Sequence, residues 1–390
     1  MEKPAVYLMF ILILIVTLFL PSCSKEHDHS HAHSIAMPFD LLGISEHGVL
    51  EVIDDVLWFH DFESGEKVVL CNKPDCPHEP YSRDTNPNPT CLAVLPMKNP
   101  FNAVGMYENH VYIFSSDRIN HTIVYKENLD GDGREVLAEF DWEIYKTYEN
   151  VVFQDGHAYF IGNQFTIDDE GLPIDDKKKL VVASLDLKNG DFTELSAVRD
   201  DHLSGIGTLR IFADKLYYQH VYFNEEMDFM AEDAIEKIKL YGHAQMYEID
   251  LATNKEKLIL DLDQENGTLQ DLDGKYLYFL SDDQKKVSTV SLNDFSRKTL
   301  FEGNEISQPR ILGDGIVYSQ DNLYDGTLYF YDFNTNKTTK IKRPEQETNP
   351  LLAYDDWIVT SASIDDGEFH NVLIKRKDYL EGKDNYIVLN

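Results

Sequence analysis

The chain has 390 residues, of which 43% are hydrophobic and 12% aromatic, enough apolar material for a globular core. It carries 69 acidic and 35 basic side chains, so its formal net charge at pH 7 is −34. A surface this acidic repels phosphate groups, which argues against nucleic acids and anionic membrane surfaces as partners.

The first 22 residues are predicted to be a lipoprotein signal peptide. Val6–Leu20 is an apolar run of 15 residues, which is shorter than the ~20 residues that a membrane-spanning helix needs. The Leu-Pro-Ser-Cys23 stretch that ends the leader resembles a bacterial lipobox, with an aliphatic residue three positions before the cysteine and a small residue directly before it. The resemblance implies diacylglyceryl transfer to the Cys23 thiol, cleavage before it and acylation of the new amine. An uncleaved anchor and a plain secretory signal are the alternatives.

Residues 23–36 are polar and lack periodicity, which predicts a flexible tether between the lipid anchor and the folded domain. Four histidines alternate within it: His27, His29, His31 and His33. Two or three imidazoles on a flexible chain can surround Zn²⁺, Ni²⁺ or Cu²⁺, although the tract must lose entropy to do so. A weak metal site and a simple spacer are both open interpretations of this tract.

A β-hairpin motif recurs through residues 37–390. In each copy an apolar strand leads to an Asp or Asn turn, and a short strand follows. The turns begin at Asp61, Asn128, Asp186, Asp250, Asn293 and Asp332. Asp and Asn side chains accept hydrogen bonds from the backbone two residues on, and the Gly or Asn in these turns tolerates a positive φ. A further strand precedes each hairpin and is usually centred on an aromatic residue, as at Tyr112, Tyr159 and Tyr318.

A three- or four-stranded unit that recurs about every 40–60 residues predicts an all-β fold, a β-propeller. The units span residues 40–72, 100–140, 147–198, 205–262, 268–302, 307–343 and 350–390. One blade alone exposes an apolar face, so the units must stack in a ring. We therefore expect a single propeller domain with seven blades. Six blades and a peripheral element are the alternative, because the first and last units are the least regular and the turn near Asp378 departs from the pattern.

The remaining cysteines all lie in a proline-rich insertion after the first hairpin, residues 71–91. Cys71, Cys76, Cys91 and the nearby His78 supply three thiols and one imidazole. This is the donor set of a tetrahedral structural zinc site, which could hold together a loop with no core of its own. One disulfide with a leftover thiol is the competing interpretation, favoured by an oxidising exterior. The odd number of thiols and the crowding of cysteine and histidine favour zinc, and in either case the role is structural.

The motif Cys71-x-Lys-Pro-Asp-Cys76-x-His78 with a third cysteine, next to the lipobox and the propeller repeats, resembles a group of lipid-anchored propellers of Firmicutes. That group is similar to TolB-like propellers and to other propellers that carry a domain of unknown function. The resemblance covers most of the mature chain, and the Cys/His insertion is its one specific motif. It implies a secreted lipoprotein with a propeller and no established activity, and it carries over no catalytic residues.

Three other stretches stand out from the repeat. Asn128–Gly133 alternates carboxylates as a calcium loop does, but no closing Glu follows at the required spacing, so we interpret it as the turn of its hairpin. Residues 167–179 are a polar insertion in the third blade, which we expect to be a solvated loop. In residues 224–242, Met227, Met230 and the apolar residues after them recur at helical spacing, which predicts an amphipathic helix inserted in the fourth blade. It packs on a blade edge, or it forms a lid or partner surface.

Enzyme signatures are absent from the sequence. It holds no Gly-x-Ser-x-Gly elbow, no His-Glu-x-x-His motif, no phosphate-binding glycine loop and no dinucleotide fingerprint. We therefore expect a monomeric, non-catalytic module on the extracytoplasmic side of the bacterial membrane that binds a protein or glycan of the cell envelope. One alternative is capture of zinc by the His-rich tether. Another is a polysaccharide-active propeller enzyme with its acids on separate blades, for which no catalytic residue can be named.

Overall fold

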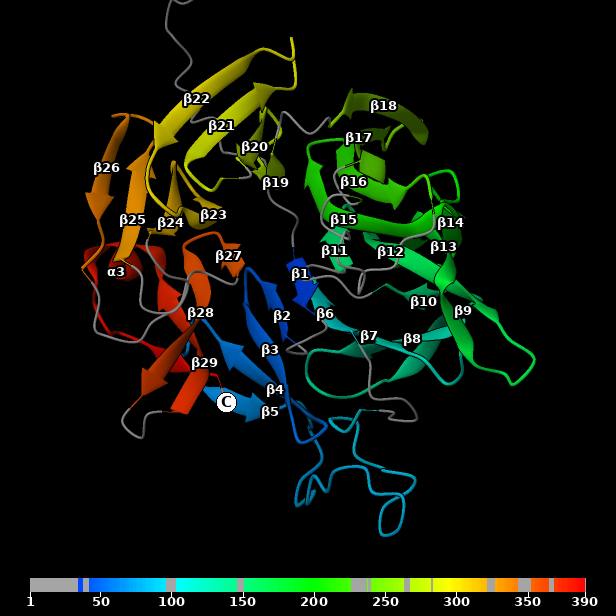
Figure 1. Ribbon diagram of the computed structural model, residues 1–390. Helices are drawn as coiled ribbons and strands as arrows, with labels where there is room; N and C mark the ends of the chain where they lie inside the picture. Colours follow the sequence, from blue (N-terminus) through cyan, green and yellow to red (C-terminus); the bar gives the residue numbers. More distant parts are fainter. Residues whose placement is uncertain are drawn as a thin grey trace, which may run out of the picture.

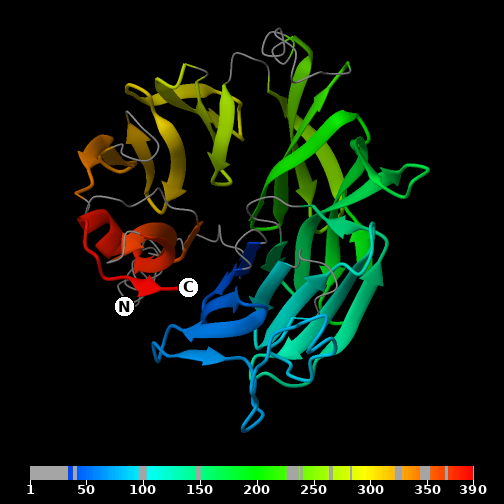
Figure 2. The same ribbon diagram turned by 60° about the horizontal axis from the view of Figure 1, so that its bottom comes forward.

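The chain forms a seven-bladed β-propeller, as its repeats predicted, and the six-bladed alternative is wrong. The computed structural model describes residues 34–37, 42–95, 103–145, 151–225, 237, 240–262, 267–281, 283–320, 327–342, 352–364 and 368–389. Within these ranges, seven antiparallel units of four strands surround a common axis (Figures 1 and 2). Almost all of the regular secondary structure among these residues is β-strand.

The blades follow one another in chain order. The first comprises β2 (Leu42–Ser45), β3 (Gly48–Ile53), β4 (Val56–Asp61) and β5 (Lys67–Val69), and the second comprises β6 (Ala103–Tyr107), β7 (His110–Ser115), β8 (Thr122–Asn128) and β9 (Glu135–Phe140). The third comprises β11 (Val151–Gln154), β12 (His157–Ile167), β13 (Pro173–Asp186) and β14 (Phe192–Glu194), with β10 (Glu143–Ile144) paired to β12. The fourth comprises β15 (His202–Phe212), β16 (Lys215–Phe223), β17 (Gly242–Asp250) and β18 (Lys255–Asp261).

The last three blades repeat the same order. The fifth comprises β19 (Thr268–Leu272), β20 (Tyr276–Leu280), β21 (Lys286–Ser291) and β22 (Arg297–Glu302), and the sixth comprises β23 (Ser307–Leu312), β24 (Gly315–Gln320), β25 (Thr327–Asp332) and β26 (Lys337–Lys340). The seventh comprises β27 (Leu352–Tyr354), β28 (Trp357–Ile364), β29 (Glu368–Lys375) and β30 (Ile387–Val388). The helix α3 (Arg376–Glu381) stands between β29 and β30, where the sequence departs from the repeat.

The turns between the two outer strands of a blade form as their side chains dictate. Asp186 Oδ1 accepts the N–H of Lys188 at 2.7 Å, and Asp332 Oδ1 accepts the N–H of Asn334 at the same distance. Gly190 has a φ of 78° in the first of these turns, which a residue without a side chain adopts at no steric cost. The predicted turns at Asp61, Asn128, Asp186, Asp250 and Asp332 are confirmed. The turn of the fifth blade begins at Ser291 and not at Asn293, because Ser291 Oγ accepts the N–H of Asn293 and the Ser291 carbonyl oxygen accepts that of Phe295.

Apolar side chains between neighbouring blades make up the core. Seven clusters of buried side chains each join two consecutive blades, and Val49 of the first blade packs with Leu373 of the seventh to close the ring. At the same junction, Lys67 Nζ donates to the carbonyl oxygen of Leu389 at 3.0 Å. Figure 2 shows these blue and red blades side by side. Because burying each large apolar side chain contributes about 1.5–3 kcal/mol, stability is spread over seven interfaces.

β1 (Ser34–Met37) lies near the centre of the ring, outside the repeat (Figure 1). It pairs with β2 on one side, where Ser34 faces Ser45, and with β11 on the other, where Ser34 faces Phe153. The strand therefore bridges the first and third blades and lies beside β6 of the second. Residues 34–36, which the sequence placed at the end of the flexible tether, are strand.

Two insertions differ from the repeat. The polar stretch 167–179 is not the solvated loop that we expected, because β12 and β13 continue through it as a long hairpin and leave only residues 168–172 as a turn. Most of the predicted helix at 224–242 lies outside the described residues, among which Lys237, Leu240 and Tyr241 are helical. No helix among the residues that the structure describes is long and apolar enough to cross a membrane.

Candidate metal centre and inter-blade groove

The four predicted metal ligands of the insertion meet at one point. One donor atom each from Cys71, Cys76, His78 and Cys91 can be chosen so that all four lie within 4.8 Å of one another. His78 Nδ1 is 3.4 Å from Cys91 Sγ. A tetrahedral zinc site separates its ligand atoms by roughly 3.3–3.8 Å, so a contraction of about 1 Å would complete the coordination sphere. All three thiols are free, and no disulfide joins them among the residues described.

Local backbone conformation brings the ligands together. Cys71 follows β5 after one residue, so the edge of the first blade fixes its position. Asp75 and His78 adopt positive φ values of 59° and 49°, which turn the chain back sharply on either side of Cys76. Cys91 is only 6% exposed and belongs to the apolar cluster between the first two blades. Three ligands therefore sit on a tight loop, and the fourth is anchored in the core.

Backbone N–H groups donate to the sulfur atoms of two of the cysteines. The N–H of His78 donates to Cys76 Sγ, and this bond lowers the pKa of the partly buried Cys76 thiol below its ordinary value of 9.0. Burial raises the pKa of Cys91 to about 12, against the opposing effect of the N–H of Ala93, which donates to its sulfur. A bound cation deprotonates a coordinating thiol outright. The donor set therefore fits a thiolate-binding metal.

An arginine of the second blade fastens the segment that follows Cys91. Arg134 Nη1 donates to the carbonyl oxygen of Val94 at 2.9 Å, and Nη2 donates to that of Leu92. Its Nε donates to Glu127 Oε2 at 2.6 Å, and the Glu127 side chain is fully buried. The first blade holds the same segment, since Leu57 N–H donates to the carbonyl oxygen of Ala93 at 2.7 Å.

Gly131 brings the β8–β9 turn of the second blade against the start of the insertion. It has a φ of 81°, and a Cβ at this position would stand 2.5 Å from the carbonyl carbon of Leu70, next to Cys71. The glycine therefore lets the β8–β9 turn touch the backbone that leads into the metal ligands. The stretch Asn128–Gly133 is a hairpin turn, as interpreted from the sequence.

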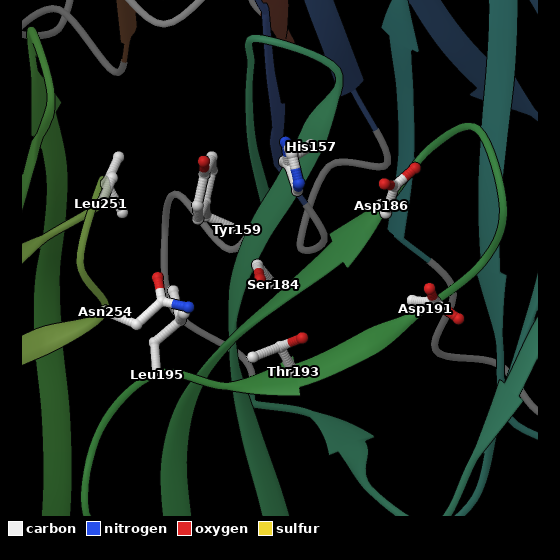
Figure 3. A pocket seen from close by; sticks show the side chains of 9 residues that line it. All are labelled: His157, Tyr159, Ser184, Asp186, Asp191, Thr193, Leu195, Leu251 and Asn254. Carbon is white, nitrogen blue, oxygen red and sulfur yellow. The ribbon is translucent and has the colours of Figure 1, made fainter.

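A polar groove of 280 Å³ opens between the third and fourth blades (Figure 3). The third blade contributes His157 and Tyr159 from β12, Ser184 and Asp186 from β13, and Asp191, Thr193 and Leu195 in and around β14. The fourth blade contributes Leu251 and Asn254 from the turn between β17 and β18. No sequence motif had indicated this groove, because its residues belong to the blade-building repeats.

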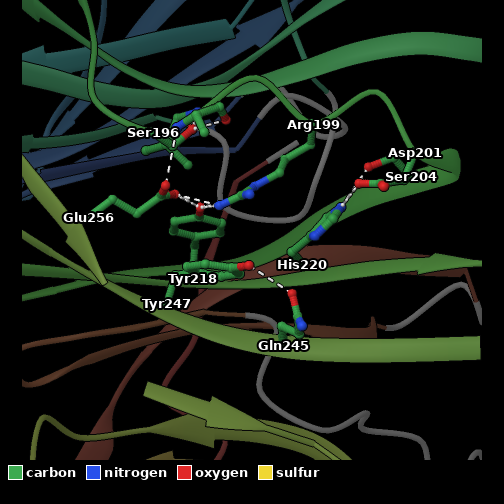
Figure 4. Close-up of polar contacts among 11 residues, drawn as sticks. Ser196, Arg199, Asp201, Ser204, Tyr218, His220, Gln245, Tyr247 and Glu256 are labelled. Carbon is green, nitrogen blue, oxygen red and sulfur yellow. Dashed lines mark hydrogen bonds and ion pairs between the residues drawn. The ribbon is translucent and has the colours of Figure 1, made fainter. Parts of the chain in front are cut away.

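A polar network next to the groove ties the same two blades together (Figure 4). Glu256 Oε1 accepts a hydrogen bond from Arg199 Nη2 at 2.7 Å and another from the Tyr218 hydroxyl. The Arg199 guanidinium carbon lies 4.3 Å from the centroid of the Tyr247 ring, a cation–π contact. The backbone N–H of Arg199 donates to the carbonyl oxygen of Leu180 in the third blade at 2.8 Å.

Ser204, His220 and Asp201 lie together in the fourth blade but do not form a catalytic triad (Figure 4). Ser204 Oγ and Asp201 Oδ2 are 2.8 and 3.6 Å from the same ring nitrogen, His220 Nε2. A triad requires them on opposite nitrogens. His220 Nδ1 is buried without a partner among the described residues. Burial lowers the pKa of His220 to about 4, and Ser204 and His220 are 1% and 2% exposed, which closes them to a substrate.

The other predicted site residues lie outside the described part of the chain. These are the lipidation candidate Cys23 and the tether histidines His27, His29, His31 and His33. Their assignments stay predictions.

The sequence matches no protein-family model and no curated protein. Solved structures do match it. A prolyl endopeptidase structure aligns with a TM-score of 0.53 at 12% identity, over 99% of this chain and 55% of that one. A puromycin-hydrolyzing peptidase of Mycobacterium tuberculosis aligns with a TM-score of 0.52 at 12% identity, over 90% of this chain and 53% of that one. TolB from Acinetobacter baumannii aligns with a TM-score of 0.36 at 12% identity, over 73% and 66%.

The likeness to the two peptidases concerns the propeller fold alone, because 12% identity carries no information about a site. This chain spans about half the length of each peptidase chain.

Proposed function

We propose that this protein is a lipid-anchored β-propeller on the outer side of the bacterial cell membrane, where it binds an envelope protein or glycan without catalysing a reaction. The lipobox-like sequence before Cys23 supports the anchor, and the polar tether supports a domain held just off the membrane. The net charge of −34 favours a soluble module that avoids the anionic lipid surface.

One observation carries the non-catalytic part of this proposal. In the grouping of serine, histidine and aspartate described above, Ser204 and His220 are closed to solvent and the geometry around His220 is not that of a triad. What the described surface offers instead is the polar groove between two blades, whose side chains donate and accept hydrogen bonds. Such a groove suits recognition.

The insertion is a structural zinc centre in this proposal, with Cys71, Cys76, His78 and Cys91 as ligands. Thiolate and imidazole donors in a closed tetrahedral set are the ligands of structural zinc sites. The support is the convergence of the four donor atoms within 4.8 Å. The ion would fix a loop whose residues between Cys71 and Cys91 are mostly exposed and present it beside the first two blades, where Figure 1 shows it projecting from the ring.

Elemental analysis of the mature protein tests the metal assignment. We expect one zinc per chain, retained when residues 25–33 are deleted and lost in Cys91→Ser. Cys23→Ser is the matched control, since it removes a cysteine outside the cluster. A chain without zinc would contradict the centre. Zinc that disappears with the tether would instead favour metal capture by the histidines.

Affinity capture from solubilised envelopes tests the binding function. The immobilised mature protein should recover a protein or a glycan, and it should leave peptides and polysaccharides intact on long incubation. Turnover of a polysaccharide would favour the propeller-enzyme alternative and overturn the proposal. For the anchor, Cys23→Ser should move the protein from the membrane fraction to the soluble fraction.

A further inference from the structure

The groove between the third and fourth blades has the chemistry of a saccharide site, and we propose that it binds neutral or amino sugars. This inference rests on the proposed binding function and names the ligand class for one site. It uses no residue of the metal centre or of the tether.

Strand register builds the polar wall of the groove. Tyr159 on β12 faces Ser184 on β13, which faces Thr193 on β14. Since paired residues of neighbouring strands point to the same face, three hydroxyl groups form a row across the blade (Figure 3). With strands ~4.8 Å apart, the row spans roughly 10 Å. A second row begins with His157, which faces Asp186.

Two of these side chains are largely buried, and their hydroxyl groups, which reach the groove, lack a protein partner among the described residues. Tyr159 and Ser184 are each 6% exposed, and neither side chain has a hydrogen-bond partner in the part of the chain that the structure describes. Neither hydroxyl is among the fully buried atoms without a partner, so both are open to water in the groove. A ligand hydroxyl that displaces this water can take over its hydrogen bonds.

Two carboxylates in the groove, those of Asp186 and Asp191, determine which charge a bound sugar can carry. Asp186 uses Oδ1 to accept the turn N–H of Lys188, and its second oxygen has no partner among the described residues. Asp191 accepts from Asn189 Nδ2 through Oδ2 at 2.8 Å. Two carboxylates in a chain of net charge −34 repel uronates and phosphates, whereas they accept hydrogen bonds from hydroxyl or ammonium groups.

Hydroxyl donors and carboxylate acceptors together match a ligand rich in hydroxyl groups. Leu195 and Leu251 give the groove apolar surface as well, which the non-polar face of a sugar ring can cover. A volume of 280 Å³ limits the occupant to a small portion of a saccharide chain.

The walls of the groove are held at a fixed spacing. Leu195 and Asn254, one on each side, are close in sequence to Ser196 and Glu256 of the polar network. Glu256 Oε2 accepts the N–H of Ala197 at 3.3 Å, and its other oxygen holds Arg199. A preformed groove avoids part of the ordering cost of binding.

Calorimetry on the mature protein tests the inference. Cellotriose serves as the neutral probe, the glucosamine trimer as the cationic probe and trigalacturonate as the anionic probe. We expect binding of the neutral or the cationic trimer and none of the anionic one. Tyr159→Phe and Ser184→Ala should each weaken that binding about fivefold, the loss of one hydrogen bond. Thermal unfolding checks that each variant folds.

Tyr112→Phe is the matched control. The second blade carries the same His-x-Tyr pattern, and Tyr112 occupies the position of Tyr159 but lies outside the groove. Its substitution should leave saccharide affinity unchanged. Binding of trigalacturonate alone, binding of no trimer, or equal losses in Tyr112→Phe and Tyr159→Phe would overturn the saccharide site. Recovery of an envelope protein by a chain that binds no trimer would overturn this inference while leaving the binding function in place.

Discussion

Replacing Arg134 by methionine tests whether the second blade holds the metal-binding insertion in place. The substitution keeps an unbranched, flexible side chain but removes the cation. Three interactions are lost: the ion pair with Glu127 and the hydrogen bonds to the carbonyl oxygens of Leu92 and Val94. Since Leu92 directly follows the ligand Cys91, both the stability of the protein and its retention of zinc should decrease.

The expected loss follows from burial. The Glu127 side chain is fully buried and that of Arg134 is 11% exposed. Removing one partner of a buried pair costs about 3–5 kcal/mol, because a charge is left without compensation. In a chain of this size the loss corresponds to a fall in Tm of roughly 5–10 °C.

The pH dependence of the stability loss in Arg134→Met shows whether the uncompensated charge of Glu127 causes that loss. Burial raises the pKa of Glu127 above its ordinary value of 4.5, and Arg134 opposes that shift. Without the arginine the pKa rises further. A carboxyl group whose folded-state pKa exceeds its unfolded value takes up a proton on folding, so stability increases as the pH falls through the folded pKa toward 4.5. The deficit of Arg134→Met should therefore be largest at pH 8 and shrink toward pH 5.

Urea unfolding at pH 8 and pH 5, with zinc analysis at both, measures these effects. Arg118→Met is the control, because Arg118 is 63% exposed and its 3.7 Å contact with Asp117 lies on the surface of the same blade. Its loss should stay below about 1 kcal/mol. An Arg134→Met deficit as small as that of Arg118→Met, or one that grows toward pH 5, would refute the reasoning.

Three further predictions follow from single side chains. Gly131→Ala places a Cβ 2.5 Å from the Leu70 carbonyl carbon at a φ of 81°. Urea unfolding should therefore show that the free energy of unfolding falls by about 2 kcal/mol or more, and a variant as stable as the parent would contradict the close contact. Lys67→Met removes the ammonium group that lies 2.5 Å from the carboxylate of Glu51, which is 3% exposed and keeps a second contact with His60. Calorimetry should therefore give a loss of about 2 kcal/mol at the ring closure, and an unchanged Tm would contradict that role. Because the pKa of His220 falls from 6.5 to about 4 on folding, the unfolded state binds more protons between these values, and stability should decrease as the pH is lowered from 6.5 to 4. His220→Asn should flatten this slope, and an unchanged slope would exclude His220 as its cause.

The propeller could be predicted from the sequence because its determinants are local. The Asp and Asn turns, the Gly and Asn residues that tolerate positive φ, and the strands centred on aromatic residues all act within about ten residues. The unit predicted at residues 307–343 became strands from Ser307 to Lys340, and the others agree as closely. The irregular turn near Asp378 also has a physical origin, since helix α3 occupies it.

The polar stretch 167–179 shows where local reasoning failed. Its charges indicated solvent, and they are compatible with solvent, but a two-stranded extension of an existing blade can also carry polar side chains on its faces. The existing pairing of β12 and β13 supplies the nucleus, and Asp168 closes the turn by accepting the N–H groups of Glu170 and Leu172. The ladder hydrogen bonds of the hairpin thus outweighed the polarity of its side chains.

The four metal ligands could be predicted as a set from the sequence. The residues that hold the insertion against the second blade, Arg134 and Glu127, could not. Cys71, Cys76 and His78 are close in sequence, and cysteine is rare enough in this chain for Cys91 to stand out. Arg134 and Glu127 carry no such signal. The carbonyl groups that Arg134 holds lie 40 and 42 residues earlier in the chain, and one arginine among 35 basic residues is not distinctive. The ring brings these distant segments together only once the first two blades pack.

The groove illustrates the same limit within the repeat itself. His110-x-Tyr112 and His157-x-Tyr159 are the same pattern in successive blades, and the sequence assigns both tyrosines to the core. Tyr112 packs against the ring of Phe153 in the next blade, with centroids 5.8 Å apart. Tyr159 instead borders a groove whose far wall is the β17–β18 turn of the fourth blade. A repeat fixes which residues face the neighbouring blade, but what the neighbour presents there determines whether a hydroxyl is a core atom or a candidate for binding.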